Sequence, residues 1–169
     1  MKFVSSLKPR SLYPALIIIS VLLSFVIIAA CARQSAEGQK MPALKAQPTP
    51  QAVVDEHIDA LNRCDWNRLM AQYPENAEIF LPGGQVMKGR EQVGEMFRNA
   101  VKPFKDGGLC GVIFKPEHTF AVGGTINAQW SASGDMLAEP YLGSDAYVTK
   151  DGYMAAMVTT FDHSQMKAK

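Results

Sequence analysis

The sequence predicts an α+β fold in which N-terminal helices pack on a curved antiparallel sheet. Residues 50–103 contain apolar positions at helical spacing, whereas residues 109–161 form short runs rich in β-branched and aromatic residues. The dipeptides Gly123-Gly124, Ser133-Gly134 and Asp151-Gly152 separate several of these runs, as expected for the turns of an antiparallel meander. Helices followed by such a meander are typical of an α+β domain. If the sheet is bent and the helices cover its concave side, a cavity remains between them.

The predicted helices begin at residues that favour helix starts. Thr49 followed by Pro50 predicts an N-cap and a first helical position. Asp65 predicts the cap of a short second helix over 66–71, and Gly89 begins a third helix. The first helix has one apolar face, formed by Val53, Val54, His57, Ile58 and Leu61.

The predicted strands are short and are separated by turn residues. The first covers 77–81 and is followed by a proline and two glycines. Asp151-Gly152 stands between two later runs, and this dipeptide strongly favours a hairpin turn. The remaining runs predict strands over 109–114, 119–122, 125–132, 141–149 and 153–161.

The composition predicts one globular domain without affinity for nucleic acid. The chain has 169 residues, 47% of them hydrophobic and 20% charged, which allows a packed core. Three of the 17 basic residues lie in the first ten positions, namely Lys2, Lys8 and Arg10. The rest of the chain has 14 basic against 16 acidic side chains, so we expect no basic patch.

Residues 1–30 have the pattern of an export signal. The three cations precede an apolar run over 12–30. Ile28-Ala29-Ala30-Cys31 then resembles the bacterial lipobox, so Cys31 is the predicted lipid-bearing first residue of the mature protein. An uncleaved anchor and ordinary secretion are the alternatives, because the run approaches the roughly 20 residues that span a bilayer. A lipid or an anchor would hold the domain at the cell envelope, on the periplasmic or extracellular side.

Polar segments flank the predicted domain. Residues 31–49 contain two prolines and no apolar period, so they predict a flexible tether. Residues 163–169 predict a polar tail, which leaves 50–162 as the folded domain.

Two cysteines, Cys64 and Cys110, lie within the predicted domain. In an oxidising compartment they form a disulfide that closes a long loop, or else both are small, buried apolar side chains. The sequence leaves these two alternatives open. No cluster of histidines and cysteines has metal-ligand spacing, so we expect neither a metal nor another cofactor.

Three segments, taken together, resemble the SnoaL-like branch of the nuclear transport factor 2-like (NTF2-like) superfamily. They are 57–65 (HIDALNRCD), 76–90 (NAEI, followed by a proline and then Gly-Arg) and 143–152 (GSDAYVTKDG). The resemblance covers about residues 50–162 and implies a cone-shaped fold in the order α-α-β-α-β-β-β, with a deep apolar pocket. The superfamily includes ketosteroid isomerases, polyketide cyclases, dehydratases and non-enzymatic binding or assembly modules, so the fold does not fix the function.

The resemblance also implies candidate catalytic residues. The hydrogen-bond donor of the first helix falls at His57, and the acid of the penultimate strand falls at Asp145. The base on the first long strand falls at Leu81, which cannot take a proton. The alternatives are a histidine satisfied within the core and an acid on the surface.

Seven further side chains are candidates for the wall of the pocket. For the six aromatic side chains the alternative is plain core packing, which is the commoner role of such residues, and for His118 the alternative is a position facing solvent. They are Trp66, Tyr73, Phe97, His118, Trp130, Tyr147 and Phe161.

These observations favour a membrane-tethered module that binds a small apolar molecule in a cone-shaped pocket. One alternative is a metal-free isomerase, cyclase or dehydratase that uses His57 and Asp145. The other is a non-catalytic interaction module that forms a homodimer through its sheet.

Overall fold

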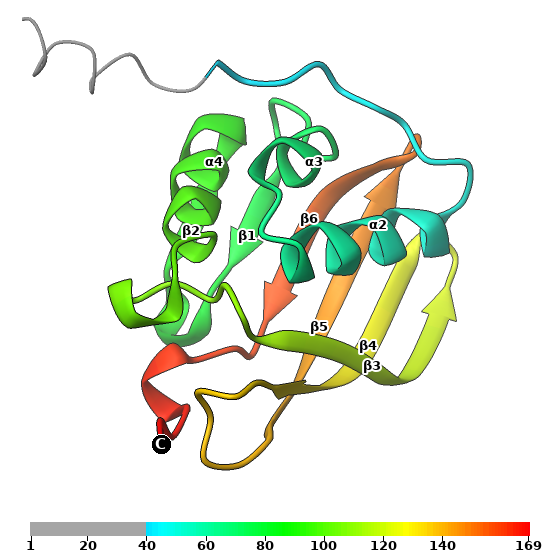
Figure 1. The fold of residues 1–169 in the computed structure, drawn as a ribbon. Helices are drawn as coiled ribbons and strands as arrows, with labels where there is room; N and C mark the ends of the chain where they lie inside the picture. The colour runs from blue at the N-terminus through cyan, green and yellow to red at the C-terminus, as the bar shows by residue number, and fades with distance from the viewer. Residues whose placement is uncertain (1–39) are drawn as a thin grey trace, which may run out of the picture. The chain divides into compact units, whose positions relative to one another are not determined.

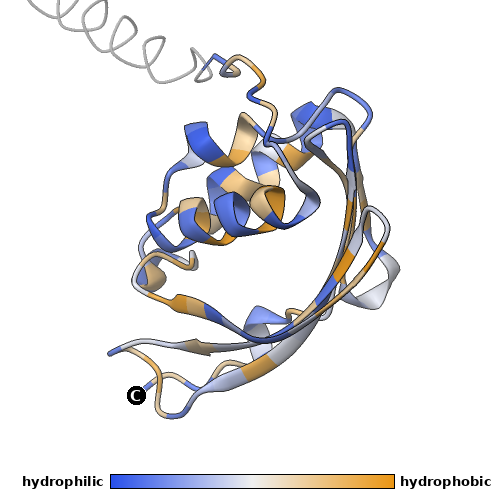
Figure 2. Cartoon of the chain, turned by 90° about the vertical axis from the view of Figure 1, so that its right-hand side faces the viewer, coloured by the Kyte–Doolittle hydropathy of each residue, from blue (hydrophilic) through white to orange (hydrophobic). Residues whose placement is uncertain are grey.

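A six-stranded sheet curves around three helices in residues 40–169, the part of the chain that the computed structural model describes (Figure 1). The predicted signal over 1–30 and Cys31 lie outside these residues. Figure 2 shows the sheet as an arc whose concave face is covered by the helices, so the predicted α+β fold is confirmed. The helices are α2 (Pro50–Asn62), α3 (Trp66–Met70) and α4 (Gly89–Ala100).

The predicted caps of the first two helices are confirmed. The Thr49 hydroxyl accepts a hydrogen bond from the Ala52 N–H at 3.1 Å, and the Asp65 carboxylate accepts one from the Arg68 N–H at 3.0 Å. These bonds satisfy N–H groups that have no partner within the helix. Of the predicted apolar face of α2, Val53, Val54, His57 and Ile58 are buried and Leu61 is partly buried.

The strands follow one another in the order β2-β1-β6-β5-β4-β3. Neighbouring strands are antiparallel, except that β1 runs parallel to β6. The predicted hairpin between β5 and β6 is confirmed, since Asp151 and Gly152 have the positive φ values, 53° and 81°, that a type I′ turn requires. The strands are β1 (Glu78–Phe80), β2 (Val86–Lys88), β3 (Ile113–Val122), β4 (Thr125–Ser133), β5 (Tyr141–Lys150) and β6 (Tyr153–Thr159).

Two strands differ from the prediction. Strand β3 is continuous where the sequence predicts separate strands over 109–114 and 119–122, because a register shift between Pro116 and His118 lets the pairing with β4 continue past the proline. Strand β2 is absent from the predicted elements, since three residues are too few for an alternating pattern to stand out.

Residues 41–49, predicted as part of the flexible tether, instead pack along the domain. The Lys45 N–H donates a hydrogen bond to the Ala71 carbonyl at 2.8 Å. The Arg90 guanidinium donates another to the Pro42 carbonyl. Backbone bonds of this kind are open to almost any residue, so the sequence contains no pattern that predicts them.

The predicted polar tail, 163–169, also packs on the domain. The Ala138 N–H donates a hydrogen bond to the Lys167 carbonyl at 2.8 Å, and the Lys169 N–H donates one to the Met136 carbonyl at 3.0 Å. The compact unit therefore extends over 41–169 rather than 50–162.

A single hydrophobic core lies between the concave face of the sheet and the helices. Among residues 40–169, no helix combines the length and the apolar character needed to cross a bilayer. The largest fully buried apolar side chains include Leu69, Met70, Tyr73, Ile79, Ile126 and Met154.

Candidate ligand-binding site

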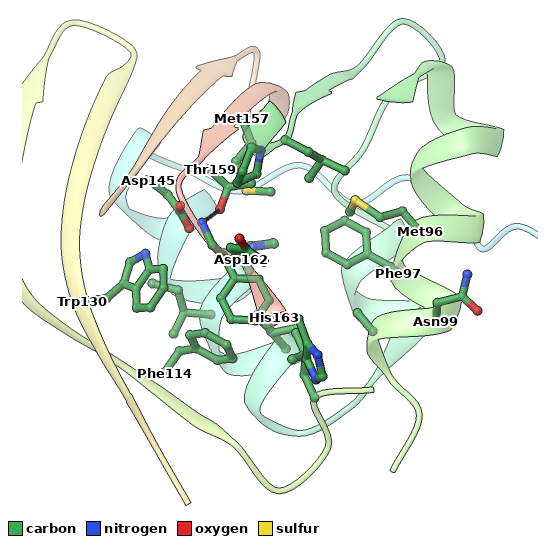
Figure 3. Close-up of a pocket in the computed structure, with 18 of the residues that line it drawn as sticks. Met96, Phe97, Asn99, Phe114, Trp130, Asp145, Met157, Thr159, Asp162 and His163 are labelled. Atoms are coloured by element: carbon green, nitrogen blue, oxygen red, sulfur yellow. Dashed lines mark hydrogen bonds between the residues drawn. The ribbon is translucent and has the colours of Figure 1, made fainter. Parts of the chain in front are cut away.

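A cavity of about 500 Å³ lies between the helices and the concave face of the sheet (Figure 3). Helix α2 contributes His57, Ile58 and Leu61, and helix α4 contributes Met96 and Phe97. The wall formed by the sheet consists of Phe114, Pro116, Trp130, Asp145, Tyr147, Met157 and Thr159. Asn99 and Ala100 at the end of α4 also line the cavity, and the remaining lining residues come from the connecting segments and the C-terminal segment, namely Leu81, Pro82, Gly83, Gln85, Gly107, Leu109, Phe161, Asp162 and His163.

Strand alternation places three chemically distinct side chains on the same wall. Asp145 and Tyr147 are two residues apart on β5 and therefore share a face. Trp130 lies on the adjacent strand, where it pairs with Gly143. A Cβ atom at Gly143 would stand 2.4 Å from the indole ring, so only glycine leaves room for Trp130 in this position.

Asp145 is a buried acid held by three neighbours. Its Oδ2 accepts a hydrogen bond from the Tyr147 hydroxyl, and its Oδ1 accepts one from the Thr160 N–H, both at 3.2 Å. Burial raises the pKa of Asp145 above its usual value, while hydrogen bonds from Thr159, Thr160 and Tyr147 and the nearby Trp130 side chain oppose that shift. The neutral acid is thus favoured more than it would be on the surface.

His57 is a buried, neutral imidazole. Its Nδ1 lies 3.2 Å from the Tyr73 hydroxyl, and its ring makes contacts with Phe97 and Tyr147 at centroid distances of 5.7 and 5.6 Å. Burial lowers the pKa of His57 to about 4, because the charged form loses its hydration. The imidazole is therefore uncharged at neutral pH. In this neutral form it has one nitrogen that can donate a hydrogen bond and one that can accept it.

Tyr147 links the two candidate catalytic residues. Its ring contacts the imidazole of His57, and its hydroxyl contacts the carboxyl of Asp145. Burial raises the pKa of Tyr147 well above its usual value, so the phenol keeps its proton. The structure thus brings His57 and Asp145 together around one cavity, where Tyr147 contacts both of them and stays uncharged.

Four of the seven predicted wall residues lie on the cavity and three do not. Phe97, Trp130, Tyr147 and Phe161 line it. The Trp66 indole is instead buried at α4, where its N–H donates to the Gly94 carbonyl at 2.9 Å. Tyr73 is fully buried behind His57.

His118 lies on the opposite face of the sheet from the cavity. Pro116 pairs with Trp130 and lines the cavity, so simple alternation would place His118 there as well. The register shift between them pairs His118 with Gln129 instead and turns its side chain to the outer, exposed face.

Sequence reasoning missed several lining residues. Met157 and Thr159 alternate along β6, and this spacing is a signal that could have identified them. His163 and Asp162 belong to a segment with no regular pattern, and the ring of His163 reaches Phe104 at a centroid distance of 5.6 Å. No sequence signal distinguishes these last two from ordinary surface residues.

A disulfide stands at one side of the cavity. Cys64, just after α2, and Cys110, before β3, form this bond with a Cα–Cα distance of 5.7 Å. Their neighbours Leu61 and Leu109 both line the cavity. Within residues 40–169, no three His, Cys, Asp or Glu side chains are grouped in a way that could hold a metal ion.

The sequence matches the family model described as the SnoaL-like domain over residues 54–165. Among curated proteins, none matches the chain.

Solved structures show the same fold at low sequence identity. An NTF2-like protein of unknown function from Cytophaga hutchinsonii is 18% identical, with a TM-score of 0.54, over 70% of this chain and 95% of that protein. An LEH-like epoxide hydrolase from Mycobacterium tuberculosis is 17% identical, with a TM-score of 0.52, over 71% of this chain and 89% of the hydrolase. A computationally designed 17-OHP binder is 16% identical, with a TM-score of 0.58, over 73% and 98% of the two chains.

Proposed function

Because the chain belongs to the SnoaL-like domain family, we propose that its pocket binds a small, largely apolar molecule. The observation that carries this proposal is the cavity of about 500 Å³, whose wall is mostly apolar and aromatic with a few inward polar groups. This volume and this lining are typical of small-molecule sites. Proteins of similar fold include a designed 17-OHP binder and an epoxide hydrolase, which illustrates that such a scaffold serves both binding and catalysis.

The chemistry of the pocket favours binding over proton transfer. Leu81 lines the cavity at the position where the resemblance implies a base, and its side chain has no proton-accepting atom. His57 has a pKa of about 4, which makes it a weak base at neutral pH. Retention of a neutral ligand needs neither of these groups to change its charge.

A titration with 2-isopropylnaphthalene tests the binding function. We expect saturable binding by calorimetry, and a Phe161→Ala variant that binds more weakly because the ligand loses an aromatic contact. Phe120→Ala is the matched control, since Phe120 is 61% exposed and lies outside the cavity. Absence of saturable binding by the wild type would refute the proposal.

The second candidate function is a metal-free isomerase, cyclase or dehydratase. It is favoured by one observation, namely that Tyr147 contacts both His57 and Asp145 within the same cavity. In such an enzyme Asp145 would act as the proton donor, and turnover would fall as the acid ionises. An Asp145→Asn variant with unchanged turnover would remove this candidate.

The third candidate function is a homodimer formed through the outer face of the sheet. Strand pairing places apolar side chains on the face opposite the helices, and an apolar surface of this kind marks an interaction site. These exposed residues are Phe80, Phe120, Val122, Leu142, Val148 and Val158. We expect a dimer by light scattering, disrupted by Leu142→Glu and kept by Gln51→Glu on the exposed side of α2.

We further propose that the domain is tethered to a membrane through a lipid on Cys31, outside the cytoplasm. The support is the cationic start, the apolar run and the Ala29-Ala30-Cys31 sequence. In a bacterial host, Cys31→Ser should prevent lipid attachment and change the membrane-associated fraction. Mass spectrometry of the N-terminal peptide distinguishes a lipidated cysteine from an uncleaved anchor.

A further inference from the structure

Trp130 carries a hydrogen-bond donor with no acceptor. Trp130 is 3% exposed, and its indole N–H has no acceptor at hydrogen-bonding distance and angle. Among the described residues that line the cavity, it is the one with such an unpartnered buried nitrogen or oxygen. A buried N–H without an acceptor loses its hydration and gains nothing in return, so groups of this kind are rare in folded proteins.

The unpartnered N–H lies beside the carboxyl of Asp145. Figure 3 shows both side chains next to one another on the wall of the cavity, and the Trp130 side chain lowers the pKa of Asp145, so the indole N–H lies near the carboxyl without meeting hydrogen-bond geometry. Each carboxyl oxygen already accepts a hydrogen bond, from the Tyr147 hydroxyl and from the Thr160 N–H. The position of the indole is fixed, because its ring fills the space left by Gly143.

We propose that the Trp130 indole N–H anchors the ligand by donating a hydrogen bond to a neutral oxygen, so that the ligand is an apolar molecule bearing a carbonyl or hydroxyl group. This inference rests on the proposed binding function and specifies its ligand class. A ligand oxygen in this place would satisfy the indole N–H, and it would lie within reach of Asp145 as well.

The charge of the site excludes an anionic ligand. Among the described residues that line the cavity there is no lysine or arginine, whereas Asp145 and Asp162 are both present. A carboxylate in the cavity would therefore lose its hydration without a compensating cation, and it would meet a like charge wherever Asp145 or Asp162 is ionised. A ketone or an alcohol avoids this cost and still offers an acceptor oxygen to Trp130.

An NMR titration on the wild-type protein provides the direct test. The chain has only two tryptophans, so its two indole N–H resonances are assigned by Trp66→Phe and Trp130→Phe. With 2-acetylnaphthalene we expect the Trp130 resonance to move downfield, and with 2-isopropylnaphthalene, which has nearly the same shape, we expect no such movement. The Trp66 resonance should stay in place with both probes, because its N–H already donates to the Gly94 carbonyl.

Calorimetry then measures the strength of the anchor. Trp130→Phe should weaken 2-acetylnaphthalene about tenfold, which is the range of a single hydrogen bond, and leave 2-isopropylnaphthalene nearly unchanged. Trp66→Phe is the matched control and should preserve the preference for the ketone. 1-(2-Naphthyl)ethanol should behave as the ketone does, and 2-naphthoate should bind more weakly than the hydrocarbon. The measurements use residues 41–169, after a check of cooperative unfolding, and are repeated on the full chain in nanodiscs.

The outcomes separate this inference from the proposed function. If 2-isopropylnaphthalene binds but the ketone binds no more tightly and moves no indole resonance, the anchor is refuted while the apolar pocket stands. If the wild type binds neither probe, both proposals fail. If Trp130→Phe does not fold, the resonance shift of the wild type alone decides.

Discussion

The hydroxyl of Tyr147 donates a hydrogen bond to Oδ2 of Asp145 at 3.2 Å, from a position two residues further along the same strand. The bond keeps the phenol proton pointed at the acid and leaves the ring of Tyr147 against His57. Asp145 and His57 therefore lie in one environment with few charged groups. Replacing either residue should change the pH dependence of stability in a predictable direction.

The first prediction concerns Asp145→Asn. Since burial raises the pKa of Asp145, the folded protein holds its proton at pH values where the unfolded chain has released it. The wild type therefore loses stability as the pH rises from about 3.8, the value in the unfolded chain, through the higher folded-state pKa. The asparagine variant does not titrate, so its free energy of unfolding should gain on that of the wild type over this range.

Urea unfolding between pH 4 and pH 8 measures this difference. Asp162→Asn is the control: hydrogen bonds from Ser164 lower the pKa of Asp162, so this carboxyl titrates below the measured range and its replacement should give a difference that does not change with pH. A difference between wild type and Asp145→Asn that stays constant with pH would contradict the prediction.

The second prediction concerns His57→Gln. The pKa of His57 is about 4 in the folded protein and 6.5 in the unfolded chain, so the unfolded chain binds the extra proton between these values. The resulting stability is fully present above pH 6.5 and is lost as the pH falls toward 4, by about 3 kcal/mol in total. Glutamine cannot protonate and should remove this loss.

The comparison of the two unfolding curves isolates the contribution of His57 from that of Asp145, which acts in the other direction. Phe120→Ala serves as the control, because it changes an exposed side chain and no titratable group, and it should keep the slope of the wild type. A His57→Gln variant with that same slope would show that the imidazole is protonated or solvated in the folded state.

Local sequence patterns predicted most of the fold because local interactions determine it. Thr49 and Asp65 cap their helices through hydrogen bonds three residues away, and Asp151-Gly152 favours its turn with no help from the rest of the chain. The inward direction of His57 follows in the same way from helical spacing.

Long-range relationships account for the errors. Alternation fails for His118 because the register shift after Pro116 moves its side chain to the other face of the sheet. The sequence shows the proline but does not show which residues of the next strand it pairs with. Trp66 is aromatic like the residues of the cavity wall. Its side chain is placed elsewhere by the hydrogen bond to the Gly94 carbonyl, 28 residues away in the sequence. The packing of 41–49 depends on backbone bonds that leave no trace in side-chain identity.

The third prediction concerns Arg90→Met, which releases residues 41–49. The buried guanidinium donates to the carbonyls of Pro42 and Met70, the latter at 2.9 Å, so its removal leaves acceptors of two segments without a partner. We expect a loss of about 2 kcal/mol in the free energy of unfolding. Hydrogen exchange at the Lys45 amide, which bonds the Ala71 carbonyl, should become faster.

Arg63→Met is the matched control for this test. Arg63 forms an ion pair with Asp59, and its side chain is 68% exposed, so its loss should change stability by less than about 1 kcal/mol. Unchanged exchange at Lys45 in Arg90→Met would mean that the segment is held by other contacts.

The fourth prediction concerns the disulfide between Cys64 and Cys110, which are 46 residues apart in the sequence. Closing a loop of this length restricts the unfolded chain and stabilises the folded one by about 4 kcal/mol on a chain-entropy model. The double variant Cys64→Ser/Cys110→Ser should lose about that amount in urea unfolding. It should also bind 2-isopropylnaphthalene more weakly, because the bond holds Leu61 and Leu109 at the edge of the cavity. A reductant should lower the stability and the binding of the wild type but not of the double variant. If both proteins respond equally to the reductant, the disulfide is not the cause of the difference.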